Sequence, residues 1–339
     1  MNPFTEAKIV GAQVSGVEYN HEPARRGAAD YVVRSHCLGE ILRNAHRWVT
    51  GYKSPESKAK DYGSLLDCMI LVPEQWAARY ALRPDTYPAP AKHAKVKSGE
   101  IKEGDPLDWN ARAAHCQEWA DRHRGKTLVS MEAQANAHLA FTVIHEMPRA
   151  SEAIASGAHQ VWVSAVYVDK DTGRRIPVKG LIDVVPAGEH PIFGEFLFDL
   201  KTTRNASPAN FRRECFKYNY DLQAALYLDI YNAACPEFTR INFAHIVQEN
   251  YPPWETRVPI LSQAFLNRGR ARYRHGLALY ARAQETGNWP SYDPDGDDWP
   301  ITEPEDWMLA PGLVYEGLDD LDDEPQTESR AAEALDLIP

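Results

Sequence analysis

Four segments between residues 160 and 249 have the apolar patterns of β-strands, and the first of them alternates apolar and polar residues. Alternation with Val, Trp and Tyr is typical of strands, and the D-T-G turn at 171–173 favours a hairpin between the first two. Three predicted strands follow one another and the fourth stands apart: residues 160–169, 174–187, 192–203 and 240–249. We therefore expect three consecutive strands, then a helix, then a further strand.

Apolar residues recur at helical spacing in five other segments. The first has Ser35 as its predicted N-cap, the second stops at Pro73 and restarts, and the third divides near Pro148. The predicted helices are residues 34–52, 60–82, 128–156, 208–234 and 262–287, the last closed by Gly287. Residues 1–30 show no clear periodicity, and residues 83–110, rich in Pro, Gly and Lys, predict a long loop.

The order of these elements predicts the fold class. Helices, three strands, a helix, a strand and a final helix indicate an α/β protein with a mixed central sheet flanked by helices. We expect a single domain over residues 1–315, with a helical N-terminal portion at about 31–156 and a sheet-and-helix core at about 157–290. Residues 316–339 are acidic and low in aromatic residues, so we predict a disordered tail.

Charge and cysteine content narrow the class of protein. The chain has 339 residues and a net charge of −11, of which −8 lies in the acidic tail with its nine acids and one arginine. The remaining body is close to neutral at −3, so nucleic acid is not excluded as a partner if basic residues line one groove. Five scattered cysteines argue against a disulfide framework, a structural zinc or an iron–sulfur cluster. Without a run of roughly 18–20 apolar residues or a signal-peptide pattern, we expect a cytoplasmic protein with no membrane contact.

The stretch FGEFLFDLKTT, residues 193–203, is a candidate for chemistry because Asp199 and Lys201 interrupt an apolar strand. Acid-x-lysine occurs four times in the chain and about two matches are expected by chance, so the motif alone decides nothing. Only this match follows another acid in an apolar strand, Asp183 in KGLIDVV. An unpaired carboxylate in such a setting usually becomes neutral, pairs with a cation or binds a metal.

Asp183 and Asp199 lie on neighbouring predicted strands, where they can converge on one divalent ion. Alternation sends Asp199 and Lys201 to the same face of their strand. Hard oxygen ligands with open water positions suit Mg²⁺ or Mn²⁺. Lys201 can then polarise or deprotonate a water that attacks a phosphodiester. Two ordinary salt bridges at strand ends are the alternative.

The helix predicted after this strand adds two polar groups. Gln223 and Tyr227 are four residues apart and share a face, with Tyr220 and Tyr231 close to it. An amide and a phenol in that position can orient a phosphate or a catalytic water. A helix that only covers the sheet with an aromatic stripe is the alternative.

Taken in order, these residues resemble a known nuclease core. G-x-I-D ending at Asp183, D-x-K-T-T from Asp199 and Y-x-x-Q-x-x-x-Y from Tyr220 are similar to the PD-(D/E)XK nuclease superfamily in its exonuclease branch. The chain most resembles the phage-recombination alkaline exonucleases, namely the lambda-exonuclease-like and exonuclease VIII-like proteins. YGSLLDCMILVPEQW and ETGNWPSY resemble further segments of that group, so the resemblance covers residues 34–292.

The resemblance implies a restriction-endonuclease-like core and a Mg²⁺-dependent exodeoxyribonuclease, with Mn²⁺ as a substitute and two ions in each site. Such an enzyme digests one strand of linear double-stranded DNA in the 5′→3′ direction. It leaves 3′ single-stranded overhangs for a single-strand annealing protein in recombination. The resemblance also implies a homo-oligomeric ring, a trimer in preference to a tetramer, and an origin in a bacterium or a prophage.

The same resemblance assigns the central roles. Asp183 and Asp199 correspond to metal ligands, with the backbone carbonyl of Leu200 as a third. Lys201 corresponds to the water-activating base or charge stabiliser.

Other positions correspond less directly to the family pattern. Gln223 and Tyr227 match groups that support the site or position DNA. Asp67 stands where the family often has His, and its carboxylate can also bind the second metal. Gln160 stands where an acid is expected at the start of the first strand, and its amide oxygen is a weaker metal ligand.

Two basic regions are candidates for DNA contact. Arg34 and Ser35 begin the first predicted helix, whose N-terminus favours an anion such as a 5′-phosphate, with a plain cap as the alternative. Lys92 and Lys95 belong to a basic stretch that can follow a DNA backbone or remain a solvated loop; its other members are Lys97 and Lys102. Four arginines alternate along the last helix and favour a solvated or intersubunit surface over DNA: Arg268, Arg270, Arg272 and Arg274.

Two other functions stay open on the sequence. The same core occurs in endonucleases and single-strand nucleases, which do not require a free duplex end. The changes at Asp67 and Gln160 are also compatible with a DNA-binding subunit that has lost turnover.

Overall fold

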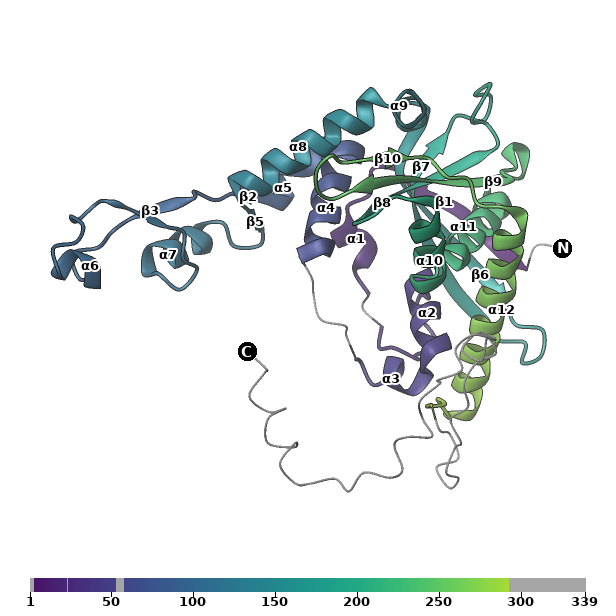
Figure 1. Ribbon diagram of the computed structural model, residues 1–339. Helices are drawn as coiled ribbons and strands as arrows, with labels where there is room; N and C mark the ends of the chain where they lie inside the picture. Colours follow the sequence, from purple (N-terminus) through teal and green to yellow (C-terminus); the bar gives the residue numbers. More distant parts are fainter. Residues whose placement is uncertain (1–2, 23, 53–57, 293–339) are drawn as a thin grey trace, which may run out of the picture. The chain divides into compact units, whose positions relative to one another are not determined.

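A six-stranded mixed sheet forms the centre of the computed structural model, which describes residues 3–22, 24–52 and 58–292 (Figure 1). In spatial order its strands are β1 (Phe4–Gly11), β6 (Gly157–Val168), β7 (Arg175–Pro186), β8 (Phe196–Thr203), β9 (Asn242–Glu249) and β10 (Thr256–Arg257). β7 pairs antiparallel with both β6 and β8, whereas β8 and β9 are parallel. The mixed sheet expected from the sequence is therefore confirmed.

Helical layers cover both faces of this sheet. One face packs against α11 (Tyr220–Ala234), behind which lie α2 (Ser35–Arg43) and α12 (Gln263–Thr286). The other face packs against α4 (Lys58–Leu71), α8 (Met131–Glu146) and α9 (Pro148–Ala155). In β8, Leu197 joins the first core, whereas Phe198 and Leu200 join the second. A strand buried on both faces reads as a nearly continuous apolar run, which explains the sequence around Asp199.

The strands at the two edges were not predicted. β1 pairs antiparallel with β6 through two register shifts, and most of its side chains are at least partly exposed. Phe4 is the exception, since it packs against Tyr167 and Tyr273. An irregular edge strand with little burial carries no strong alternation, so the absence of periodicity in residues 1–30 gave no sign of it.

Several helix predictions need adjustment at their ends. The segment 208–234 is two helices, α10 (Pro208–Lys217) and α11, because Asn219 adopts a left-handed φ of 62° between them. The first predicted helix is also divided, into α2 and α3 (Ala45–Val49), and the N-cap of α2 is Arg34 rather than Ser35. The break at Pro148 and the C-cap at Gly287 are confirmed, the latter with a φ of 73°.

Residues 83–126, here called the insertion, are more structured than the predicted loop. They contain β3 (Thr86–Pro88), α6 (Ala94–Lys97), β4 (Pro106–Asp108) and α7 (Ala114–Arg122). β2 (Tyr80–Leu82) and β5 (Thr127–Val129) pair in parallel at the root of the insertion. η1 (Pro73–Gln75) and α5 (Trp76–Arg79) lead into β2. Two further short helices lie outside this region, α1 (Gly16–Asn20) and η2 (Pro236–Phe238). Elements this short are below the length at which periodicity is detectable.

Three of the four alternating arginines of α12 form ion pairs within the fold, which their spacing did not predict. Arg268 and Arg272 pair with Asp221, and Arg270 lies 3.1 Å from Asp229. Both carboxylates belong to α11 and are buried under α12. A buried carboxylate must be compensated, and the arginines next to it do so while keeping their outer parts near solvent.

Within the described residues, no helix is long and apolar enough to span a membrane. The predicted boundary at residue 315 and the acidic segment 316–339 lie outside the described residues. All described residues belong to one compact unit, Met1–Tyr292.

The close crossing of α11 and α12 predicts unequal effects for two glycines of one helix. A Cβ at Gly269 would lie 2.0 Å from the backbone oxygen of Asp221, whereas at Gly276 it would meet only side chains, those of Leu38 at 3.3 Å and Leu42 at 3.4 Å. We expect Gly269→Ala to lower the free energy of unfolding by about 1–3 kcal/mol, because backbone must shift. Gly276→Ala should be neutral or stabilising by up to about 1 kcal/mol through helix propensity. Urea denaturation of both variants checks this, and equal stabilities would contradict it.

Candidate functional site

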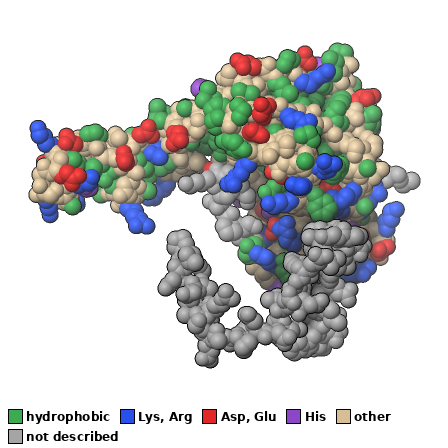
Figure 2. All heavy atoms as spheres, in the orientation of Figure 1, with side chains coloured by type: hydrophobic (Ala, Val, Ile, Leu, Met, Phe, Trp, Pro, Cys, Tyr) green, Lys and Arg blue, Asp and Glu red, His purple; other side chains and the backbone are tan. Residues whose placement is uncertain are grey.

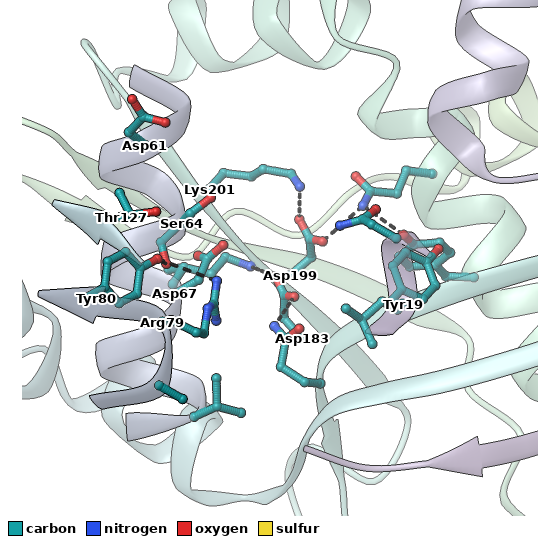
Figure 3. Close-up of a pocket in the computed structure, with 18 of the residues that line it drawn as sticks. Tyr19, Asp61, Ser64, Asp67, Arg79, Tyr80, Thr127, Asp183, Asp199 and Lys201 are labelled. Carbon is teal, nitrogen blue, oxygen red and sulfur yellow. Dashed lines mark hydrogen bonds and ion pairs between the residues drawn. The ribbon is translucent and has the colours of Figure 1, made fainter. Parts of the chain in front are cut away.

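A pocket of about 650 Å³ lies where β7, β8, α4 and α11 meet (Figure 3). The structure brings together here every residue that the sequence nominated as catalytic or metal-binding: Asp67, Asp183, Asp199, Leu200, Lys201, Gln223 and Tyr227. These residues come from four elements, so only the fold unites them.

Asp183 is held by hydrogen bonds to both of its carboxylate oxygens. The side-chain amide of Gln160 donates to Oδ1 at 2.9 Å, and the backbone N–H of Leu200 donates to Oδ2 at 2.7 Å. The β6–β7 register sets Gln160 opposite Asp183, with a left-handed φ of 47° at Gln160. Burial, followed by the negative charges of Asp199 and Asp67, raises the pKa of Asp183 well above its ordinary value. Gln160 thus orients an acid in this structure, at a position where the family pattern predicted an acid.

Asp199 and Lys201 face the pocket together from β8. The Nζ of Lys201 lies 2.5 Å from Oδ2 of Asp199, and the Gln223 amide donates to Oδ1 of Asp199 at 3.2 Å. The same amide donates to the hydroxyl of Tyr227 at 3.3 Å. Burial is the largest single influence and lowers the pKa of Lys201, but Asp199, Tyr220 and Asp183 together outweigh it and the pKa rises. Lys201 is therefore a protonated cation at neutral pH.

His245 is a member of this cluster that the sequence did not single out. It pairs with Asp199 in the parallel β8–β9 register, and its Nε2 lies 3.9 Å from Oδ2 of Asp199. Burial, and then the charge of Lys201, lowers the pKa of His245 well below its ordinary value, so the imidazole is neutral. The imidazole of His245 packs against three aromatic rings, those of Phe211, Tyr220 and Phe243. One histidine in an apolar strand gave no spacing signal, because its partner lies on another strand.

α4 forms the opposite side of the pocket. Asp61, Ser64 and Asp67 are spaced three residues apart on this helix and all line the cavity. Burial is the first cause that raises the pKa of Asp67, to about 7; Lys201 lowers it, and Asp199 raises it further. The sequence placed Asp67 with the sheet acids only through resemblance, and the fold now sets it within reach of their charge.

The residues nominated for DNA contact divide into two groups. Arg34 donates to Oδ1 of Asn20 at 2.5 Å and lies over the Tyr19 ring, and both partners line the pocket. A hydrogen bond from Ser35 to the Tyr227 hydroxyl lowers the pKa of Tyr227, which burial raises overall. The N-terminus of α2 therefore lies beside the site.

Lys92 and Lys95 are on the insertion and do not line the pocket. Both side chains are exposed, and Lys95 pairs with Glu100 at 3.0 Å. Figure 2 shows blue and red side chains interspersed over the insertion instead of one continuous basic stripe. The structure thus leaves their proposed role in DNA binding untested.

The chemistry of the carboxylates tests whether a divalent metal fits. The charge of Asp199 raises the pKa of both Asp67 and Asp183, and a cation beside these carboxylates would relieve that repulsion. Oδ2 of Asp199 is buried and accepts no hydrogen bond from any described residue, despite its short contact with Lys201. Within residues 3–22, 24–52 and 58–292, no three His, Cys, Asp or Glu side chains are arranged to hold a metal by themselves. Carboxylate oxygens are the ligand type that Mg²⁺ takes in proteins, usually alongside several waters.

The raised pKa of Asp67 predicts a pH dependence of stability in the metal-free protein. An Asp with a folded-state pKa of about 7 and an unfolded value of about 3.9 stabilises the fold below pH 4, and loses that contribution as pH rises through 7. We expect Asp67→Asn in EDTA to lose less stability than wild type between pH 4 and 7, by on the order of 2 kcal/mol. Urea denaturation across this range checks it. The exposed Asp108→Asn is the matched control, and parallel curves for all three proteins would contradict the prediction.

Comparison with known proteins gives a family and a fold. A family model described as a PDDEXK-like domain of unknown function (DUF3799) matches residues 46–295. A crystal structure from Eubacterium rectale, named "Putative exonuclease", superposes with a TM-score of 0.50 at 13% identity, covering 89% of this chain and 100% of that one. At this identity the likeness shows a shared fold. No functionally curated protein matches the chain.

Proposed function

This chain belongs to the family of PDDEXK-like domains of unknown function (DUF3799), within the PD-(D/E)XK nuclease superfamily, and we propose that it hydrolyses DNA phosphodiesters with the help of a divalent metal. One observation carries the proposal: Asp183 on β7 and Asp199 with Lys201 on β8 face a single pocket. Two acids and a lysine in this arrangement suit attack of water on a phosphodiester.

Three protein groups hold the two central carboxylates in place. Leu200 and Gln160 fix both oxygens of Asp183, and Gln223 fixes one oxygen of Asp199. A divalent ion held by Asp183, Asp199 and the Leu200 carbonyl, with Asp67 as a ligand to a second ion, would activate water and stabilise the charge on the phosphate.

Lys201 has a narrower role than the sequence allowed. The raised pKa keeps its ammonium protonated, so it serves as a charge stabiliser and hydrogen-bond donor to water or phosphate. A protonated lysine cannot take a proton, which disfavours the general-base alternative. Tyr220 lies under the ammonium, with its ring centre 5.0 Å from Nζ, and restricts where the lysine can move.

The finer activity rests on the resemblance to phage-recombination exonucleases. We propose 5′→3′ digestion of one strand of linear duplex DNA, with Mg²⁺ as the natural ion and Mn²⁺ as a substitute, two ions in each site. The product would be a 3′ overhang for a single-strand annealing protein, and the enzyme would work as a homo-oligomeric ring, a trimer before a tetramer. A bacterial or prophage origin and a cytoplasmic location belong to the same proposal.

The α2 N-terminus supports a preference for 5′ ends. Arg34 and Ser35 lie beside Tyr19 and Tyr227 at the edge of the pocket, where a 5′-phosphate could be held. Lys92 and Lys95 on the insertion would then lie along the duplex, as the sequence suggested.

Removal of the Lys201 ammonium tests the catalytic role. We expect Lys201→Ala to lower the rate of duplex digestion by about 10²–10⁴-fold, because no other described cation lies beside Asp199. Linear duplex labelled at either the 5′ or the 3′ end, with Mg²⁺, measures both rate and polarity. The exposed Lys217→Ala on α10 is the matched control and should retain activity. Undiminished digestion by Lys201→Ala would contradict the mechanism.

The topology of the substrate separates exonuclease from endonuclease. We expect linear duplex to be degraded while covalently closed circular DNA of the same sequence stays intact, because an exonuclease must load at an end. Gel analysis of a mixed digest with Mg²⁺ or Mn²⁺ checks this. Cutting of the circle would favour an endonuclease, and intact linear DNA with both metals would favour a binding subunit without turnover.

A further inference from the structure

The pocket contains one cationic side chain that the mechanism above does not use. Among the described residues that line it, Lys201 and Arg79 are the two that carry positive charge. Lys201 pairs with Asp199, whereas no carboxylate of residues 3–22, 24–52 and 58–292 lies within 4.0 Å of the Arg79 guanidinium. Arg79 is thus the cation of this pocket that has no anionic partner.

The side chain of Tyr80 holds the Arg79 guanidinium in position. It ends α5 at the root of the insertion, and its guanidinium lies 5.4 Å from the ring centre of Tyr80. The hydroxyl of Tyr80 donates to the backbone oxygen of Ser64 on α4 at 2.8 Å, and one guanidinium nitrogen lies 3.5 Å from that hydroxyl. The ring therefore has a fixed position, and the arginine that rests on it keeps its fork toward the cavity.

The position of Arg79 across the pocket is as informative as its lack of a partner. Figure 3 shows Arg79, Tyr80 and Asp67 on one side of Asp183 and Asp199, and Tyr19 on the other. The charge of Arg79 lowers the pKa of Asp67, so the two groups are electrostatically close. The cavity is lined by two cations and by four carboxylates, which belong to Asp61, Asp67, Asp183 and Asp199. A polyanion that enters this pocket needs a positive contact away from the metal-binding acids.

We propose that Arg79 binds a phosphate of the DNA strand that is cut, on the side of the pocket formed by α4 and the root of the insertion. A guanidinium presents a planar fork that matches two phosphate oxygens. Lys201 and Arg79 would then contact the substrate from different sides of the carboxylates. This assignment rests on the proposed nuclease function and names a residue that the motifs did not contain.

Salt dependence of DNA binding tests the assignment directly. Full-length Lys201→Ala protein in Mg²⁺ should bind a duplex oligonucleotide without cutting it, so Arg79→Gln and Arg79→Lys are added to that background. We expect Arg79→Gln to weaken binding about tenfold and to reduce the slope of log Kd against log salt concentration by about 0.9, the loss of one phosphate contact. Arg79→Lys should keep the slope while binding more weakly than arginine. A merely structural role would leave the slope unchanged.

A control variant and two kinds of duplex end distinguish the possible outcomes. Arg282→Gln, an exposed arginine of α12 outside the pocket, should change neither Kd nor slope. Duplexes with 5′-phosphate and 5′-hydroxyl ends distinguish the source of the phosphate: an equal effect of Arg79→Gln on both indicates an internal phosphodiester, and an effect confined to the first indicates the terminal phosphate. An unchanged Kd and slope for Arg79→Gln, beside digestion by wild type, would overturn this assignment alone. Failure of wild type to bind or cut DNA would overturn the proposed function with it.

Discussion

The confinement of Asp183 and Asp199 at the centre of a doubly covered sheet is the constraint on which the rest of the site depends. Their exposed fractions are 8% and 2%, so water solvates their charge poorly. Isolated buried carboxylates are costly, and two close together are costlier still. Neighbouring groups offset this cost. The Leu200 N–H and the Gln160 amide donate hydrogen bonds to Asp183, and Lys201 forms an ion pair with Asp199.

The helical layers convert this electrostatic arrangement into a rigid one. Phe198 and Leu200 anchor β8 in the core beneath α4, and Leu197 anchors it in the core beneath α11. The side chains of Asp199 and Lys201 therefore project from a strand that cannot slide or rotate. Donors and charges that are fixed before a substrate arrives need no reorganisation during the reaction, which is the main physical source of enzymatic charge stabilisation.

The side of the pocket that faces the sheet acids is formed by helices outside the central sheet. α4 and the root of the insertion contribute Asp67, Ser64 and Arg79 from segments that lie outside the central sheet. These groups influence the sheet acids through charge: Asp199 raises the pKa of Asp67, and Arg79 lowers it. Substrate recognition can thus vary on this side without disturbing the strands that hold Asp183 and Asp199.

The four central strands, the mixed sheet and the spacing of Asp183, Asp199 and Lys201 were predictable from the sequence, because strand-like apolar segments and a charged interruption of an apolar run are local properties. Only the tertiary structure shows that the α12 arginines pair with Asp221 and Asp229, and that His245 and Arg79 lie beside the acids. It also brings Asp67, nominated by resemblance alone, to the same pocket. The edge strand β1 was also not predicted from the sequence, because little of it is buried. The physical reason is common to all of these: pairing across strands and helices depends on which elements pack together, and no local periodicity carries that information.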